Sequence, residues 1–240
     1  MTEMQRYKIA DVIIDGEFIY KYTPEICKDY LYDGNQSAEL IVKMSSDDID
    51  AEKRLAPEFS EFYLESLAFF RKICKYIMKK GNGIIFHSSA IMVDGKAYLF
   101  TAPSGTGKST HARLWREMLG ERAVMINDDK PIIRYNDGKF YVYGTPWTGK
   151  HRLGNNICAE IKAICRISQG KQNVIRKADT NEMLMVILNQ TLRPEEPEVM
   201  DNFLALIEKM LKSVELYCLS CNISREAAEL SYTTMSGGEA

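Results

Sequence analysis

The residues best placed to do chemistry form a glycine-rich run, residues 102–110, that reads A-P-S-G-T-G-K-S-T. An apolar, strand-like segment precedes the run at 97–100, and a segment with helical spacing follows it at 111–119. Glycines let successive backbone N–H groups point at one centre, and a helix start adds unpaired N–H groups and a positive dipole end. This context predicts a phosphate-binding loop, although Ala102 stands where the strict pattern G-x-x-x-x-G-K-[ST] has its first glycine.

The loop is expected to hold the phosphates of ATP or of another nucleoside phosphate. Lys108 can reach the outer phosphates, and the Ser109 hydroxyl can bind Mg²⁺. The residues expected to bind the nucleotide are Ser104, Gly105, Thr106, Gly107, Lys108, Ser109 and Thr110. An ordinary Gly-rich turn between a strand and a helix is the alternative, but such a turn needs neither the lysine nor the hydroxyl pair.

A second candidate group is the acidic pair Asp128 and Asp129, which begins twenty residues after Lys108. The pair follows an apolar, strand-like segment at 123–126, and a parallel sheet would place carboxylates at the end of that strand beside the phosphates. One aspartate could hold Mg²⁺, while its neighbour on the opposite side could accept the proton of an acceptor hydroxyl. We assign Asp128 as the base and Asp129, with Ser109, as the metal ligand; a solvated Asp-Asp turn is the alternative.

Two histidines near the loop differ in what their positions predict. His87 lies in the apolar segment 84–93, which we expect to form a strand beside the phosphate loop. Its alternatives are a hydrogen-bonded core histidine and a residue of the active site. His111 follows the loop on its helix and is expected to face outward.

Segment 144–152 combines turn residues with an aromatic ring and several cations. A loop of this composition is unlike a core segment, and exposing a tryptophan is costly without a use. We therefore expect Trp147 to stack on an acceptor while Lys150 or Arg152 meets the acceptor's carboxylate or the migrating phosphate. The alternative is a plain Gly/Pro loop in which Trp147 packs under the edge of a sheet.

Three short motifs together resemble the catalytic domain of the HPr kinase/phosphorylase family: F-H-S-S-A-I, then A-P-S-G-T-G-K-S-T, then I-N-D-D. The same loop is similar to that of ATP-dependent phosphoenolpyruvate carboxykinase, whose nucleotide-binding core that family shares. The resemblance spans roughly residues 86–147. It implies an α/β P-loop core, a catalytic histidine at His87 on the strand before the loop, and catalytic roles for Lys108 and Asp128. In place of the family's second signature stands G-T-P-W-T-G-K, and residues 1–80 do not resemble the family's regulatory domain.

The motifs and the resemblance together predict a kinase. The expected reaction is ATP- and Mg²⁺-dependent transfer of phosphate to a serine-like hydroxyl of a free amino acid, a peptide or a carrier protein. One alternative is a carboxykinase-like lyase for a small dicarboxylate, with His87, Lys150 and Arg152 as its cationic pocket. Another is a non-catalytic nucleotide sensor or peptide-binding protein, which would tolerate loss of the base aspartate.

Composition limits the partners. The chain has 240 residues, 45% of them hydrophobic, and a net charge of −2, so nothing indicates nucleic acid as its main partner. No apolar stretch approaches the ~20 residues that cross a bilayer, and the start of the chain lacks a signal-peptide core, so we expect a cytoplasmic protein without a membrane partner. A homo-oligomer is a further possibility. Six dispersed cysteines predict free thiols, with Cys218 and Cys221 on a strand as core residues or, alternatively, as a metal or redox pair.

The elements around the motifs predict an α/β P-loop core of the HPr-kinase/phosphoenolpyruvate-carboxykinase type with β-hairpins and flanking helices. We expect a core at residues 81–240, and a strand-rich segment with a helix, packed on that core, at residues 1–80. Asp-Gly pairs between apolar runs predict hairpins at 15–16, 94–95 and 137–138. The polar segment 45–53 is expected to be a loop and residues 235–240 a loose tail. Strands are predicted at 38–42 and 160–167, and helices at 57–80, 180–188, 199–211 and 224–230.

Overall fold

The structure, a computed structural model, describes residues 2–237 and divides into two compact units, Met1–Lys80 and Gly81–Ala240. The first unit has a three-stranded sheet in the order β1 (Gln5–Ile9), β2 (Val12–Glu17), β3 (Leu40–Lys43). Strands β1 and β2 are antiparallel, whereas β2 and β3 are parallel. Four helical segments complete the unit: α1 (Tyr22–Ile26), η1 (Lys28–Tyr30), α2 (Ser46–Leu55) and α3 (Glu61–Lys79). Tyr7, Phe18 and Phe69 pack edge to face in its core.

Two predictions for this unit are wrong, each for a local reason. The β1–β2 turn lies at Ala10 and Asp11, both with positive φ, and not at Asp15-Gly16, which continues β2. Gly16 is needed there for space, because a Cβ atom would lie 2.7 Å from the Phe18 ring. Residues 45–53 are not a loop: Ser45 and Asp48 form a capping box that starts α2.

The second unit is a mixed α/β unit built on a curled nine-stranded sheet. Seven strands follow one path, in the order β4 (Gly83–Ile85), β8 (Ile132–Asn136), β9 (Lys139–Tyr143), β10 (Cys158–Gln169), β6 (Lys96–Thr101), β5 (Ser89–Val93), β7 (Ala123–Asn127). The long β10 also pairs with β12 (Glu215–Cys221), which in turn pairs with β11 (Val174–Lys177). Neighbours β6 and β12 run parallel to β10, while the other strand pairs are antiparallel.

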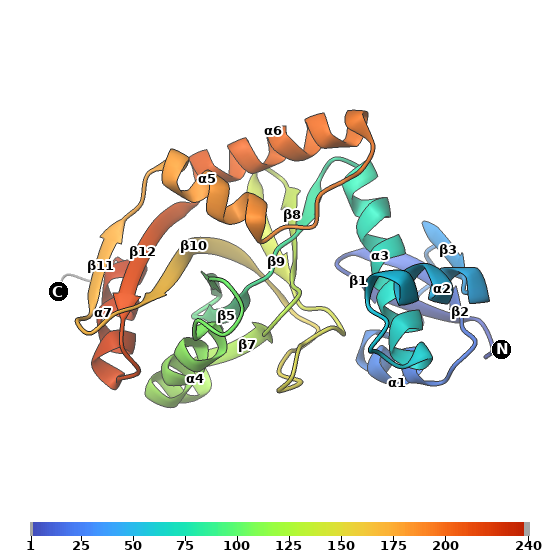
Figure 1. The fold of residues 1–240 in the computed structure, drawn as a ribbon, viewed down its shortest axis with the longest axis horizontal. Helices are drawn as coiled ribbons and strands as arrows, with labels where there is room; N and C mark the ends of the chain where they lie inside the picture. The colour runs from blue at the N-terminus through green and yellow to red at the C-terminus, as the bar shows by residue number, and fades with distance from the viewer. Residues whose placement is uncertain (1, 238–240) are drawn as a thin grey trace. The chain divides into compact units, whose positions relative to one another are not determined.

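Helices cover both faces of this sheet, as Figure 1 shows. On one face α5 (Thr180–Asn189) and α6 (Pro197–Ser213) bury residues such as Met183 and Ile207 against Leu99, Ile133 and Ile164. On the other face α4 (Lys108–Leu119) and α7 (Arg225–Ser236) bury Trp115 and Ala228, with Phe100 and Tyr217 among the strand residues of that cluster. The short segment η2 (Gly120–Arg122) joins α4 to β7.

The order and direction of the strands decide which strand ends lie next to each other. Strand β5 lies between β6 and β7 and is antiparallel to both, so β6 and β7 point the same way. The last residues of β6 and β7 and the first residue of β5 therefore share one edge of the sheet. The expected hairpins between β5 and β6 and between β8 and β9 are present, with positive φ at Asp94, Gly95, Asp137 and Gly138.

The chain ends differently from the prediction. Helix α7 starts with a cap from the Ser224 hydroxyl, as expected, but runs on to Ser236, and Met235 is fully buried. The part of the tail prediction that concerns residues 238–240 lies outside the described residues. Among the helices of residues 2–237, none has the length and apolar content needed to cross a membrane.

Candidate functional site

The predicted phosphate loop is an exposed turn followed by the start of α4. Thr106 N–H donates to the Pro103 carbonyl at 3.3 Å, and Gly105 within that turn has φ +79°. Gly107, with φ +119°, caps the helix, which begins at Lys108. A Cβ atom at Gly105 or Gly107 would meet nothing within 4 Å, so glycine serves the backbone conformation there rather than the space.

The missing first glycine of the strict motif has a structural explanation. Ala102 lies outside the left-handed region of backbone conformations, and its methyl group is fully buried in the core beneath α4. What the loop takes from this residue is its carbonyl oxygen, which accepts a 2.9 Å hydrogen bond from Lys108 Nζ. An alanine supplies that carbonyl as well as a glycine does.

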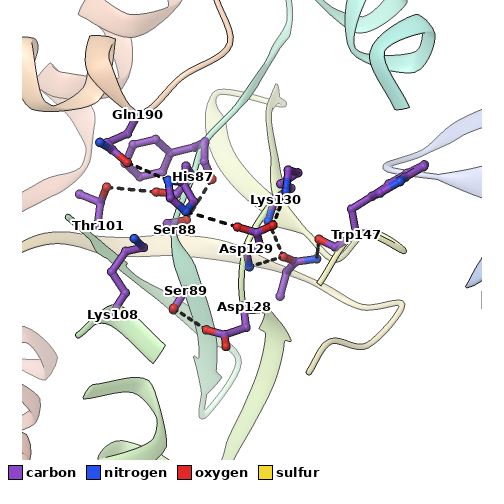
Figure 2. Close-up of polar contacts among 12 residues, drawn as sticks. His87, Ser88, Ser89, Thr101, Lys108, Asp128, Asp129, Lys130, Trp147 and Gln190 are labelled. Atoms are coloured by element: carbon purple, nitrogen blue, oxygen red, sulfur yellow. Dashed lines mark hydrogen bonds and ion pairs between the residues drawn. The ribbon is translucent and has the colours of Figure 1, made fainter. Parts of the chain in front are cut away.

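Lys108 is a buried cation, 7% exposed, at the start of α4. Burial lowers the pKa of its ammonium, while the negative charges of Asp129 and Asp128 act in the opposite direction. The fold therefore brings the lysine and both aspartates of the prediction to one edge of the sheet, as Figure 2 shows. A lysine held in this way is positioned to neutralise phosphate charge.

The two aspartates have different partners, as expected from strand alternation (Figure 2). Asp128 is buried, and its Oδ1 accepts a hydrogen bond of 2.5 Å from the Ser89 hydroxyl at the start of β5. Asp129 is half-buried and pairs with Lys130 and with His87, whose Nε2 lies 3.3 Å from Asp129 Oδ1. Burial by itself would raise the pKa of Asp129, but the His87 hydrogen bond and the Lys130 charge outweigh it and lower the pKa.

Asn127, which sequence reasoning missed, holds this acidic turn in place. Its Oδ1 accepts 2.8 Å hydrogen bonds from the backbone N–H groups of Asp129 and Lys130. Its Nδ2 lies 3.0 Å from the Thr145 carbonyl and 3.3 Å from the Trp147 carbonyl. An asparagine directly before the two aspartates at a strand end is the signal that could have revealed such a turn.

His87 lies in the short segment between β4 and β5, so the prediction that it belongs to a strand is wrong. Its backbone N–H donates to the Gln190 carbonyl at 2.7 Å, and its Nδ1 is 2.9 Å from Gln190 Oε1. Since Oε1 only accepts, a proton on Nδ1 satisfies this contact, and the imidazolium form also donates from Nε2 to Asp129. Gln190 comes from the end of α5, a distant part of the chain that no local signal connects with His87.

The other predicted residues differ in their placement, although segment 144–152 passes beside this cluster: a Cβ atom at Gly149 would lie 3.0 Å from Asp129 Cβ. The Trp147 side chain is buried, 4% exposed, and points away from Lys108, Asp128 and Asp129 in Figure 2. Lys150 and Arg152 are exposed, and Arg152 has φ +50°. The predicted outward position of His111 is wrong: it is 3% exposed, lies 2.9 Å from the Ser231 hydroxyl of α7, and packs edge to face on Phe100.

The cysteine pair Cys218 and Cys221 lies on β12, as expected, and both residues have free thiols. Cys221 is buried, and the Cys218 thiol donates to Glu182 at 3.4 Å. Within residues 2–237, no three His, Cys, Asp or Glu side chains are grouped so that they could bind a metal ion.

Comparison with known proteins gives a distant likeness. No family model matches the chain, and no curated protein is significantly similar to it. Among solved structures, the chain is similar to the HPr(Ser) kinase/phosphatase from Coxiella burnetii, with a TM-score of 0.40 and 10% identity. The match covers 64% of this chain and 88% of that chain. A likeness this distant assigns neither a function nor residue roles, so both are argued from the site itself.

Proposed function

We propose that this chain is a P-loop kinase that transfers the terminal phosphate of ATP to a serine-like hydroxyl. The observation that carries the proposal is the convergence of three parts at one edge of the sheet. An exposed glycine turn precedes α4, and the buried Lys108 ammonium lies at the start of that helix. The negative charges of Asp129 and Asp128 favour the charged form of this lysine. Phosphoryl transfer needs this combination of phosphate-binding N–H groups, a cation and carboxylates.

The residues present fit a magnesium–nucleotide. The donor set is made of hard oxygen ligands, the Ser109 hydroxyl and the Asp129 carboxylate, which Mg²⁺ prefers over nitrogen or sulfur. Asp129 suits this role because its lowered pKa keeps it ionised. The metal would neutralise charge on the phosphates, and N–H groups of residues 104–109 together with Lys108 would hold and orient them.

The same difference in surroundings supports Asp128 as the general base. A base must accept a proton, and the cationic partners of Asp129 make that carboxylate a poor acceptor. Asp128 bonds instead to a neutral hydroxyl, Ser89. In the proposed step the acceptor oxygen bonds to the terminal phosphorus, the bond from that phosphorus to the bridging oxygen breaks, and the acceptor proton passes to Asp128.

His87 would act on Asp129 and on the phosphates rather than on the acceptor. Its position between Gln190 and Asp129 fixes the ring, and its imidazolium form would add a positive charge beside the metal-binding carboxylate. Lys150 and Arg152 stay predicted acceptor residues in this proposal, whereas the burial of Trp147 favours the alternative in which its ring packs within the fold.

The deciding experiment is ³¹P NMR of the protein with ATP, Mg²⁺ and a pool of hydroxyl amino acids and serine peptides. We expect a new phosphoester signal together with ADP. Lys108→Ala should lower transfer roughly 10²–10³-fold, the loss typical of removing one preorganised charge-stabilising group. Lys96→Ala is the matched control. Lys96 is an exposed residue of β6 that pairs with Glu160 of β10, so its loss should leave transfer unchanged.

Three other outcomes would contradict the proposal. ATP binding without any transfer would favour a non-catalytic nucleotide sensor. Phosphate transfer that appears only with a small dicarboxylate and releases CO₂ would favour a carboxykinase-like lyase. Equal turnover by the wild type and Lys108→Ala would show that the phosphate loop is not the site of transfer.

A further inference from the structure

A cavity of about 710 Å³ lies beside the candidate site, between the C-terminal half of α4 and the outer edge of β7. One wall is formed by residues of α4, η2 and β7, and the other by residues 152–155, at the end of the segment that follows β9. Its lining residues are Arg116, Gly120, Glu121, Ala123, Val124, Met125, Arg152, Leu153, Gly154 and Asn155. Helix α4 and strand β7 lie next to each other in Figure 1 and contact each other.

Two arginines give the lining of this cavity a net positive charge. The second unit has nine arginines; six have side-chain hydrogen-bond or ion-pair partners, and Arg134 also has an interaction within the chain. In the described part of that unit, the two side chains without such an interaction are Arg116 and Arg152, and both line this cavity. Glu121 also lines it, so the arginines leave an excess of one positive charge. A guanidinium with all its donors unused is suited to bind a carboxylate or phosphate through two parallel hydrogen bonds.

The cavity is connected to the acidic turn through the backbone. Leu153, which follows Arg152, accepts a 3.1 Å hydrogen bond from Asp128 N–H through its carbonyl. Asn155 N–H donates to the Ile126 carbonyl at 3.1 Å, and the Asn155 side chain donates to the Met125 carbonyl at 2.7 Å. The cavity therefore begins at Leu153, whose carbonyl bonds to Asp128 N–H, and extends along β7 away from the phosphate loop.

The distance from the phosphate loop and acidic turn to the lining residues decides what kind of ligand could reach both. Arg116 follows Lys108 by eight residues, which is about 12 Å along a helix. Ala123 precedes Asp128 by five residues, which is about 17 Å along a strand. A free amino acid is too short to bridge such a distance, whereas an extended peptide covers it with about four residues. Strand β7 lies at the end of the sheet. Segment 153–155 bonds to its outer edge at Ile126 and Asp128, and over residues 2–237 no strand pairs with the part of that edge that lines the cavity, Ala123 to Met125.

We infer that this cavity is the docking site of a peptide acceptor, with Arg116 and Arg152 binding an acidic side chain of the peptide. The inference rests on the proposed function and names its acceptor class: a peptide with an acidic residue about four positions from the serine that is phosphorylated. The serine hydroxyl would lie at Asp128, and the peptide would run along β7 to the two arginines. Arg116 lies on α4, the helix that directly follows the phosphate loop, so this one helix would help to position both the nucleotide and the peptide.

The test measures binding directly, without turnover. The probes are fluorescently labelled peptides with one serine and one glutamate at increasing separations on an alanine–glycine background, and the same peptides with glutamine in place of glutamate. We expect the wild type to bind the glutamate peptides about tenfold more tightly than the glutamine peptides. Arg116→Ala and Arg152→Ala should each abolish this preference, and Arg116→Lys and Arg152→Lys should restore part of it.

The matched control is Arg113→Ala on the same helix, because Arg113 is exposed and paired with Glu117 at 2.7 Å. This variant should bind the peptides like the wild type, and all variants should bind ATP with unchanged affinity. Equal affinity for the glutamate and glutamine peptides, or wild-type binding by Arg116→Ala and Arg152→Ala, would overturn the inference. So would binding of citrate or inorganic phosphate as tight as that of the peptides.

These results separate the inference from the proposed function. Arginine-dependent peptide binding without phosphate transfer would support the docking site and contradict the kinase. Phosphate transfer whose acceptor KM is unchanged in both arginine variants would support the kinase and overturn the docking site. If both hold, KM should be lowest for the peptide whose serine and glutamate are about four residues apart.

Discussion

The phosphate loop and the acidic turn at the ends of β6 and β7 are built in opposite ways. The loop exposes Ser104 and Gly105 and is shaped by glycine backbone conformations, with a turn hydrogen bond from Thr106 N–H to the Pro103 carbonyl. The acidic turn is buried around Asn127, whose amide bonds to the backbone on both sides of the site. One region leaves its N–H groups available for a ligand, and the other has used its own.

This difference indicates in which region a substitution should change function without changing stability. Exposed loop residues contribute little to folding, so changes there should act on nucleotide binding. Buried polar groups are costly when a partner is lost, so changes in the acidic turn should act on folding as well. Within the turn, the carboxylates that face the site and the amide that holds the backbone should again behave differently.

The largest expected effect is on catalysis, from Asp128→Asn. Asparagine keeps the size of the side chain and can accept the Ser89 hydrogen bond, but it cannot accept a proton. We expect phosphate transfer to fall roughly 10²–10⁴-fold, with ATP–Mg²⁺ binding retained. Coupled-assay rates and calorimetric ATP titrations would measure the two quantities.

The control for this variant is Asp94→Asn, since Asp94 is an exposed turn residue paired with Arg122. It should transfer phosphate at the wild-type rate. Asp129→Asn should instead raise the Mg²⁺ concentration needed for half-maximal rate, because it removes a predicted metal ligand. Wild-type transfer by Asp128→Asn would contradict its assignment as the base.

A smaller effect, now on folding, is expected from Asn127→Ala. The change leaves the half-buried N–H groups of Asp129 and Lys130 and the buried Thr145 carbonyl without their partner. We expect the free energy of unfolding to fall by about 3 kcal/mol, since each orphaned buried group costs about 1–3 kcal/mol. Asn136→Ala, which removes one 3.2 Å contact with Tyr143, should cost less than about 1 kcal/mol. Urea unfolding curves give both values, and equal losses would contradict the comparison.

Local chemistry explains which parts of this fold could be predicted. The Asp94-Gly95 and Asp137-Gly138 turns were predicted correctly because a two-residue hairpin depends on its own positive-φ residues. The same rule failed at Asp15-Gly16, where the glycine accommodates Phe18 and the turn is formed by Ala10 and Asp11. The α2 capping box was readable from Ser45 and Asp48 but was outweighed by the polarity of the segment.

The site was predictable only where its residues lie in short motifs. Lys108, Asp128 and Asp129 lie in such motifs, and the fold brings them to one edge of the sheet; their roles stay predictions. Ser89 and Gln190 were not found, because their contacts depend on β5 lying between β6 and β7 and on α5 ending beside His87. Strand order and helix docking are long-range properties that no short motif encodes.

The smallest predicted effect concerns the support beneath the phosphate loop. Helix α4 is fixed to α7 through the Ser231 hydroxyl, which lies 2.9 Å from both His111 Nε2 and Trp115 Nε1. Burial lowers the pKa of His111 to about 4 from the ordinary value of 6.5, so the folded state keeps this imidazole neutral. The acidic turn depends instead on an amide that does not titrate.

This difference makes the support of the loop sensitive to acid. The unfolded chain binds a proton at His111 below pH 6.5 and the folded chain does not, so stability is complete above pH 6.5 and is lost as pH falls toward 4. At pH 5.5 the loss should be about 1.4 kcal/mol relative to pH 7.5. His111→Gln keeps an N–H donor but cannot be protonated, so its stability should change less over this range. Hydrogen exchange at pH 5.5 should quicken in α4 before β7 in the wild type only; parallel pH profiles of the two proteins would show that His111 does not supply this sensitivity.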